Sequence, residues 1–229
     1  WCYLEENSHC RFWLAPGLKF YWQVGAAQKS LNGVCGDSYG FLYLPGGRLA
    51  AILSDGMGQG EKAYRQSRSV VEMLGEFLQF GFSAQEALRT VNSLLLLRPE
   101  QESFATVDLV LLNLYSGEAE FLKIASPPAY LLRGEHVSQL KGNSLPVGII
   151  SDVSAAVIIK KMRDRDQVIL FTDGLLNKMG EDEWLQAALP ELGNLPPNQG
   201  AELLLELAEQ NWGASDDRTV LILKIKEYR

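Results

Sequence analysis

The sequence predicts an α+β fold with four layers (α-β-β-α), in which two mostly antiparallel sheets pack face to face and helices cover their outer faces. One observation is that most apolar runs are short and separated by turn dipeptides, which is typical of hairpins and of antiparallel pairing. The other is that helical stretches interrupt the strands in the second quarter of the chain and again near its end. Strands and amphipathic helices in this order bury their apolar faces best in such layers.

The first part of the domain is expected to consist of strands. Residues 21–27 predict the first strand, and residues 37–44 and 48–54 predict a hairpin around a Pro-Gly-Gly turn. Residues 55–60 form a glycine-rich stretch that predicts a turn at the end of this hairpin.

Two helices are expected next. Apolar residues recur at helical spacing across residues 63–78, and Gly81 is expected to end this helix. Ser83 and Glu86 have the spacing of a capping box, which predicts the start of the second helix. Pro99 is expected to close that helix, because proline cannot continue the backbone hydrogen bonding.

The rest of the chain predicts more strands, then helices and a last strand. The expected strands are residues 104–115, 118–125, 130–132, 137–140, 155–161, 167–171 and 219–225, and the expected helical stretches lie near residues 181–189 and 199–211. No linker rich in Pro, Gly or Ser divides the chain, so residues 21–229 are expected to form one domain. Residues 1–20 have an aromatic bias and are expected to be the end of an upstream region.

The charge balance excludes some classes of function. The chain has 229 residues, with 21 Lys and Arg against 28 Asp and Glu and a net charge of −7. Because no basic surplus can neutralise phosphates, a nucleic-acid partner is not expected. The three cysteines, a low and odd number, suit a reducing compartment. No apolar run approaches the roughly 20 residues that span a bilayer, and a cytoplasmic domain is therefore expected.

Four aspartates stand where predicted strands begin or end. Asp55 and Asp173 each follow an apolar run and precede a glycine, whereas Asp37 and Asp216 lie at the start of strands. Adjacent strands would bring such carboxylates together at one edge of the sandwich. Each Asp-Gly pair alone is typical of a turn, so only the combination indicates a site.

Carboxylates held this close repel one another unless cations lie between them. Their hard oxygen atoms suit Mn²⁺ or Mg²⁺, and the glycine after Asp55 leaves the Gly56 carbonyl free to approach an ion. Two ions roughly 4 Å apart can hold a bridging water, lower its pKa and neutralise a phosphate under attack. The pattern thus predicts a site for two ions of Mn²⁺ or Mg²⁺, but it does not by itself choose the reaction.

Four stretches of the sequence carry a family resemblance. They are Cys35-Gly36-Asp37-Ser38-Tyr39, Ile52-Leu53-Ser54-Asp55-Gly56-Met57-Gly58-Gln59-Gly60, Leu170-Phe171-Thr172-Asp173-Gly174 and Asp216-Asp217-Arg218-Thr219-Val220. In this order they resemble the motifs of the PPM (type 2C) metal-dependent protein serine/threonine phosphatases. Within that group the chain is most similar to the catalytic domains of the stage II sporulation protein E (SpoIIE) family, and the resemblance spans residues 21–225.

The resemblance implies a two-metal site at one end of the sandwich. Asp37, Asp55, Asp173 and Asp216 would be the catalytic metal ligands and the Gly56 carbonyl a further ligand, with Asp55 bridging both ions. The implied substrate is a phosphoserine on an anti-anti-sigma factor, which is attacked by the metal-bridging water. Its dephosphorylation would activate a sporulation sigma factor.

The resemblance also implies a wider context. The full-length protein is expected to carry a membrane anchor upstream of this domain. The two helices after Gly60 would be a movable switch element, although ordinary covering helices are the alternative. Self-association is expected through residues 1–20 or through these helices. Animal and plant members hold phosphate with an arginine near the N-terminal strand. Arg11, Lys19 and Lys29 lie in that region of this chain, but none of them is part of a matching motif.

Three alternatives stay open. A related phosphatase acting on a stress-response anti-anti-sigma factor would carry the same motifs. A different metal-dependent phosphoesterase, such as a nuclease, fits the acidic charge poorly. A non-catalytic regulatory domain of the same fold would be expected to lack a ligand aspartate, and all four are present. Asp217 is expected to lie beside the site without binding metal.

Overall fold

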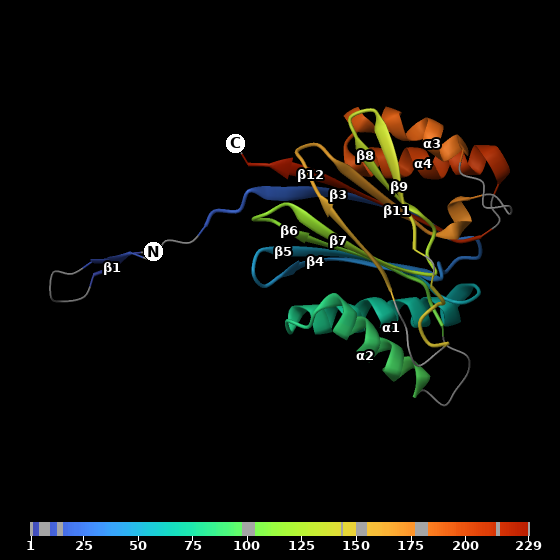
Figure 1. Ribbon diagram of the computed structural model, residues 1–229. Coiled ribbons are helices and arrows are strands. Elements are labelled where there is room, and N and C mark those ends of the chain that lie inside the picture. Colours follow the sequence, from blue (N-terminus) through green and yellow to red (C-terminus); the bar gives the residue numbers. More distant parts are fainter. Residues whose placement is uncertain are drawn as a thin grey trace.

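The computed structural model shows a four-layer sandwich, which confirms the predicted α-β-β-α architecture (Figure 1). It describes residues 2–4, 10–12, 16–97, 104–142, 144–149, 155–176, 183–213 and 216–228. Two five-stranded sheets face each other, with α1 and α2 over one outer face and α3 and α4 over the other. The helix end predicted at Pro99 lies outside the described residues.

The first sheet carries two of the predicted site residues. Its strands, in spatial order, are β10 (Ala156–Lys161), β7 (Glu118–Ile124), β6 (Val107–Asn113), β5 (Arg48–Asp55) and β4 (Asp37–Leu44). Each neighbouring pair is antiparallel, as hairpin connections require. The β4–β5 register makes Asp37 and Asp55 direct cross-strand partners at one end of the sheet.

The second sheet faces the first. Its strands, in spatial order, are β3 (Phe20–Lys29), β12 (Arg218–Glu227), β11 (Gln167–Phe171), β8 (Ala129–Arg133) and β9 (His136–Leu140). These pairs are also antiparallel, and β3 and β12 pair over their whole length. Separately, β1 (Cys2–Leu4) and β2 (Cys10–Phe12) form a short antiparallel hairpin.

Helices cover the outer faces of both sheets in the described part of the chain. They are α1 (Gly60–Gln79), α2 (Ala84–Leu96), α3 (Glu183–Ala188) and α4 (Pro197–Trp212), with 3₁₀ turns η1 (Asp173–Leu175) and η2 (Leu189–Asn194). The capping box predicted for the second helix is present: the Ser83 hydroxyl accepts from the Glu86 backbone, and the Glu86 carboxylate accepts from Ser83 N. Proline at the start of α4 costs no hydrogen bond, because the first turn has no acceptor for that N–H.

Three apolar layers hold the sandwich together. One lies between α1, α2 and the first sheet, one between the sheets, and one between the second sheet and α3 and α4. At Gly25 in β3 a Cβ atom would lie 2.1 Å from the Pro197 carbonyl carbon. Only glycine therefore lets the start of α4 lie directly on the strand backbone.

The bounds of most predicted elements differ from the observed ones by one to three residues, and two of these differences have a clear physical reason. The strand expected at residues 104–115 begins at Val107, because its partner β5 ends at Asp55 and leaves Ala105 only single bridges to Gly56 and Val147. The helix expected near residues 181–189 is described from Glu183 and changes to a 3₁₀ turn at Leu189, since the next residue is a proline without an N–H donor.

Candidate metal centre

Asp37 and Asp55 face each other at the end of the first sheet. Because the β4–β5 register pairs them directly, their side chains project from the same face of the sheet. Asp37 is 2% exposed, and its Oδ2 accepts hydrogen bonds from the hydroxyls of Thr172 (2.9 Å) and Thr219 (2.7 Å). Thr172 follows β11 and Thr219 lies in β12, so these hydrogen bonds connect Asp37 of the first sheet to the second sheet.

The backbone of Asp55 is fixed on its other side by the segment before β6. Asp55 N donates to Thr106 Oγ1 (3.0 Å), and Thr106 N donates to the Asp55 carbonyl (2.9 Å). Next along the chain, Gly56 lies so close to α1 that a Cβ atom would be 2.0 Å from the Ala63 carbonyl oxygen. The sheet and the first turn of α1 therefore hold the Asp55-Gly56 segment from both sides.

Asp173 and Asp216 lie on short segments rather than within strands. Asp173 begins η1, directly after β11, and Asp216 lies just before β12. Gln59, the residue before α1, donates its amide Nε2 to Asp216 Oδ1 at 3.3 Å. Gln59 in turn accepts a hydrogen bond from Asn32 Nδ2 at 2.9 Å, so three chain segments meet around Asp216.

Asp217 supports the site from behind. It is 5% exposed, its Oδ1 accepts from Leu31 N (2.7 Å), and its Oδ2 accepts from Gly36 N (2.6 Å). The carboxylate thereby fixes the loop that leads into Asp37. Asp217 thus lies beside the site, and its not being a metal ligand stays a prediction.

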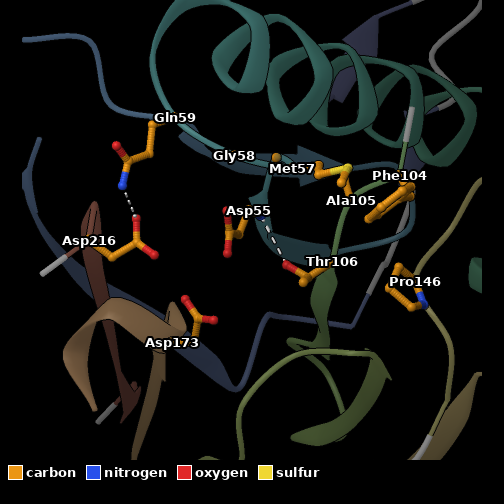
Figure 2. A pocket seen from close by; sticks show the side chains of 11 residues that line it. Asp55, Met57, Gly58, Gln59, Phe104, Ala105, Thr106, Pro146, Asp173 and Asp216 are labelled. Carbon is orange, nitrogen blue, oxygen red and sulfur yellow. Dashed lines mark hydrogen bonds between the residues drawn. The ribbon is translucent and has the colours of Figure 1, made fainter. Parts of the chain in front are cut away.

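The three carboxylates of Asp55, Asp173 and Asp216 reach into one cavity, which has a volume of about 250 Å³ (Figure 2). Met57, Phe104 and Pro146 form an apolar side of the cavity. The rest of the lining consists of Gln59 and Thr106, which hydrogen-bond to Asp216 and Asp55, and of Gly56, Gly58 and Ala105. The cavity therefore has one acidic wall and one apolar wall. Asp37 is not part of this lining and pairs with Asp55 across the two strands.

The electrostatics of the cluster favour protonated carboxyl groups. Burial raises the pKa of Asp55 to about 9, with further increases from the charges of Asp37 and Asp173. Burial also raises the pKa of Asp37 to about 6 against the opposing effect of its two threonine donors. The pKa of Asp173 is raised by burial and then by the charge of Asp216. The metal-free site thus has more buried carboxyl groups than can be ionised together without repulsion.

The residues present fit divalent cations of the Mg²⁺ and Mn²⁺ type. The donor set consists of carboxylate oxygens, and cations would relieve the repulsion that raises these pKa values. Among the described residues, no three His, Cys, Asp or Glu side chains form a closed group at metal-ligand spacing. An open arrangement suits Mg²⁺ in particular, because this ion usually binds one or two carboxylates and keeps several waters.

Sequence reasoning missed the residues that support the aspartates. Thr172 and Thr219 hold Asp37, Thr106 holds Asp55, and Gln59 holds Asp216. A signal was available for three of them, because Thr172, Thr219 and Gln59 each lie within four residues of a motif aspartate. The partner of each side chain nevertheless depends on how the two sheets pack.

Comparison with known proteins decides the family. Residues 45–226 match the family model of stage II sporulation protein E (SpoIIE). The chain belongs to this family. The stage II sporulation protein E of Priestia megaterium is 33% identical over 233 residues, and that of Bacillus subtilis (strain 168) is 32% identical over 210 residues. These alignments cover 98% and 88% of this chain but only 40% and 25% of the two relatives.

A solved structure supports the same assignment. The PP2C phosphatase domain of SpoIIE from Bacillus subtilis, solved with a fragment of its regulatory domain, is 31% identical to this chain. The TM-score is 0.85, and the match covers 93% of this chain and 66% of that one. The chain is therefore a SpoIIE-type PP2C serine/threonine phosphatase domain. No helix in its described portion has the length and apolar character needed to cross a membrane.

Proposed function

We propose that this chain removes phosphate from a phosphoserine of an anti-anti-sigma factor and thereby activates a sporulation sigma factor. The observation that carries the proposal is that three motif aspartates, Asp55, Asp173 and Asp216, line one cavity, while the fourth, Asp37, is the cross-strand partner of Asp55. The SpoIIE relatives support the sporulation substrate class. This domain would act within a longer protein, since it spans less than half of those relatives.

Two divalent cations would be held by Asp37, Asp55, the Gly56 carbonyl, Asp173 and Asp216. When bound, such ions lower the pKa of a water between them and neutralise charge on the transferred phosphoryl group. A bridging role for Asp55 is supported by its neighbours, because Asp37 is its cross-strand partner and Asp173 and Asp216 line the same cavity as Asp55. A structure of RsbX in complex with magnesium, 15% identical with a TM-score of 0.71, shares this fold.

The surrounding residues orient these ligands. The hydroxyls of Thr172 and Thr219 hold the Asp37 carboxylate, and the Gln59 amide holds that of Asp216. Fixed ligands matter because the attacking and leaving oxygens must lie in line during phosphoryl transfer. On the other wall, Phe104, Met57 and Pro146 would contact the substrate residues that flank the phosphoserine.

Phosphate binding in this cavity depends on the cations. No described Lys or Arg lines the cavity, whose charged groups are all carboxylates. Lys29 and Lys19, which the sequence placed near the expected phosphate-binding position, form ion pairs with Glu209 and Glu227. An acidic cavity alone would repel a phosphate dianion, so binding of substrate and metal should be coupled.

The test is phosphate release from a phosphoserine anti-anti-sigma protein with Mn²⁺, with Mg²⁺ and with a chelator. We expect turnover that requires metal and is lost in Asp55→Ala and Asp173→Ala, while the exposed Asp164→Ala remains active. Metal-independent turnover, or full activity of either site variant, would contradict the proposal. A panel containing a stress-response anti-anti-sigma phosphoprotein separates the two substrate classes by their kcat/KM.

A further inference from the structure

One buried cation near the site has no role in the ligand set. Arg218, the first residue of β12, is 1% exposed and is among the largest fully buried side chains. Arginine is rarely buried unless it is paired with an acid. In the described part of the chain, Arg218 forms no ion pair, and nearby Glu209 is instead paired with Lys29.

The guanidinium group binds two backbone carbonyls instead. Its Nε donates to the Gly174 carbonyl at 2.7 Å, and its Nη2 donates to the Gly213 carbonyl. Gly174 directly follows Asp173 within η1. Gly213 caps α4 and begins the segment that leads to Asp216. One rigid planar group thus connects the two segments that carry Asp173 and Asp216.

Close packing strengthens this connection. At Gly174 a Cβ atom would lie 2.0 Å from the Asp217 carbonyl oxygen and 3.2 Å from Arg218 Cγ. The end of α4 also reaches the same turn, because Trp212 Nε1 donates to the Leu175 carbonyl at 3.3 Å. The turn bearing Asp173 therefore lies against the strand start on one side and the end of α4 on the other.

This arrangement is a costly way to gain stability alone. A buried charge loses its hydration, and replacing it by an apolar side chain of similar size is often neutral or stabilising. In addition, Arg218 Nη1 is buried and has no hydrogen-bond partner in the described structure. What the guanidinium does provide is a fixed spacing between two carboxylates that repel each other.

We infer that Arg218 is a positioning residue that sets the spacing of Asp173 and Asp216 for a divalent cation. The inference rests on the proposed function, since it assumes that these two aspartates hold metal. Residues that orient metal ligands typically change metal affinity by about 10- to 100-fold when replaced. Arg218 acts through the backbone and does not touch the substrate.

Lys224 provides a matched control on the same strand. It is 8% exposed, and its Nζ donates to the carbonyls of Gly193 (2.9 Å) and Leu195 (3.4 Å), at the end of η2. It is thus a buried cation that binds two carbonyls, as Arg218 is, but away from the cavity. Lys224→Met should change thermal stability while leaving metal affinity unchanged.

The experiment measures Mn²⁺ affinity by isothermal titration calorimetry for the wild type, Arg218→Met, Arg218→Lys and Lys224→Met. We expect Arg218→Met to weaken binding at one ion site at least tenfold. The Mn²⁺ affinity of Arg218→Lys should lie between those of Arg218→Met and the wild type, because lysine keeps the charge but lacks the planar guanidinium group. With p-nitrophenyl phosphate, the Mn²⁺ concentration for half-maximal rate should rise in Arg218→Met, while the rate at saturating Mn²⁺ largely recovers.

Folded Arg218→Met with wild-type Mn²⁺ affinity would overturn the inference. Circular dichroism establishes folding; if Arg218→Met does not fold, wild-type affinity in Arg218→Lys would overturn it equally. Weakened binding in Lys224→Met of the same size would also count against it, because a general loss of stability would then explain both. Wild-type protein that binds Mn²⁺ without hydrolysing phosphoserine would refute the proposed function while leaving the affinity comparison valid.

Discussion

The two halves of the candidate metal centre are built differently. Asp37 and Asp55 are cross-strand partners inside a sheet, where the β4–β5 register sets their separation. Asp173 and Asp216 lie on a 3₁₀ turn and on a segment between α4 and β12, where no strand pairing sets their separation. In this second half, side chains such as Arg218 connect the segments instead.

The comparison teaches how each half can be changed. Moving Asp37 relative to Asp55 would require the strands to shift, which would turn every side chain to the other face of the sheet. Moving Asp173 relative to Asp216 requires only that a few hydrogen bonds open. We therefore expect the separation of Asp37 and Asp55 to be less sensitive to changes of nearby side chains than the separation of Asp173 and Asp216.

The largest effect is expected from removing a charge in the strand half. Asp55→Asn should lower kcat/KM by more than about 100-fold, because the residue is a ligand and not only a support. The same change should raise the stability of the metal-free protein, since it removes a carboxylate that burial and neighbouring charges disfavour. Phosphate release and urea unfolding in chelator measure the two effects. Lower metal-free stability would contradict the electrostatic account, and the exposed Asp164→Asn serves as the control.

The second effect concerns Asp217, which follows Asp216 in the sequence and binds the loop that leads into Asp37. Asp217→Ala removes the acceptor of Leu31 N and Gly36 N and should cost about 1–3 kcal/mol of unfolding free energy. Activity should fall about 10- to 100-fold, because the loop leading to Asp37 is released. The buried Asp166, which pairs with Arg133 away from the cavity, is the matched control. Equal losses of activity in Asp217→Ala and Asp166→Ala would remove the special role of Asp217.

The third effect is a pH dependence of the metal-free protein. A carboxyl group whose pKa is raised on folding binds more protons folded than unfolded, so stability falls as pH rises through that window. For Asp37 the window runs from 3.8 to about 6, and for Asp55 from 3.8 to about 9. In chelator, Tm should therefore be at least about 5 °C lower at pH 8 than at pH 5.

Two controls sharpen this measurement. Added Mn²⁺ should restore Tm at pH 8 by neutralising the cluster. In Asp55→Asn the decrease between pH 5 and pH 8 should shrink, since the group with the wider window is gone. A Tm in chelator that rises over this range would show that the carboxylates of the strand half do not repel one another.

The smallest effect is expected at the apolar wall, which belongs to neither half. Phe104→Ala should raise KM for a phosphoprotein by about tenfold, or ~1.4 kcal/mol, through lost contact with residues flanking the phosphoserine. KM for p-nitrophenyl phosphate, which has no flanking residues, should stay unchanged. Phe80→Ala at the exposed end of α1 is the control. An equal rise of KM for both substrates would contradict this role and indicate that Phe104 stabilises the metal centre instead.

Much of the fold could be predicted from local signals. The capping box at Ser83, the hairpin turn before Arg48 and the glycines after Asp55 and Asp173 each act over a few residues, so the sequence displays them directly. The predicted ends of strands were less accurate where tertiary contacts determine them. Strand β6 begins at Val107 only because its partner ends, and no local property of Phe104 shows this.

The supports of the site could not be predicted for the same reason. Asp217 and Leu31 are separated by 186 residues, and Thr219 and Asp37 by 182. Such pairs form only when the two sheets pack together. Arg218 binds backbone carbonyls, which every residue carries. No residue type in the sequence therefore identifies its partners. The aspartates themselves were visible because strand ends and glycines surround them; they remain predicted ligands.

The pairing of β3 with β12 has a consequence for protein engineering. Phe20 and Glu227 are register partners, so the polypeptide enters and leaves the sandwich at adjacent points. The metal centre lies at the other end of these two strands, roughly 30 Å away for ten residues at strand spacing. A short peptide could join the start of β3 to the end of β12, and new termini could be introduced in an exposed turn such as that at Gly134. The whole sandwich could equally be inserted into a host loop, with its cavity facing outward.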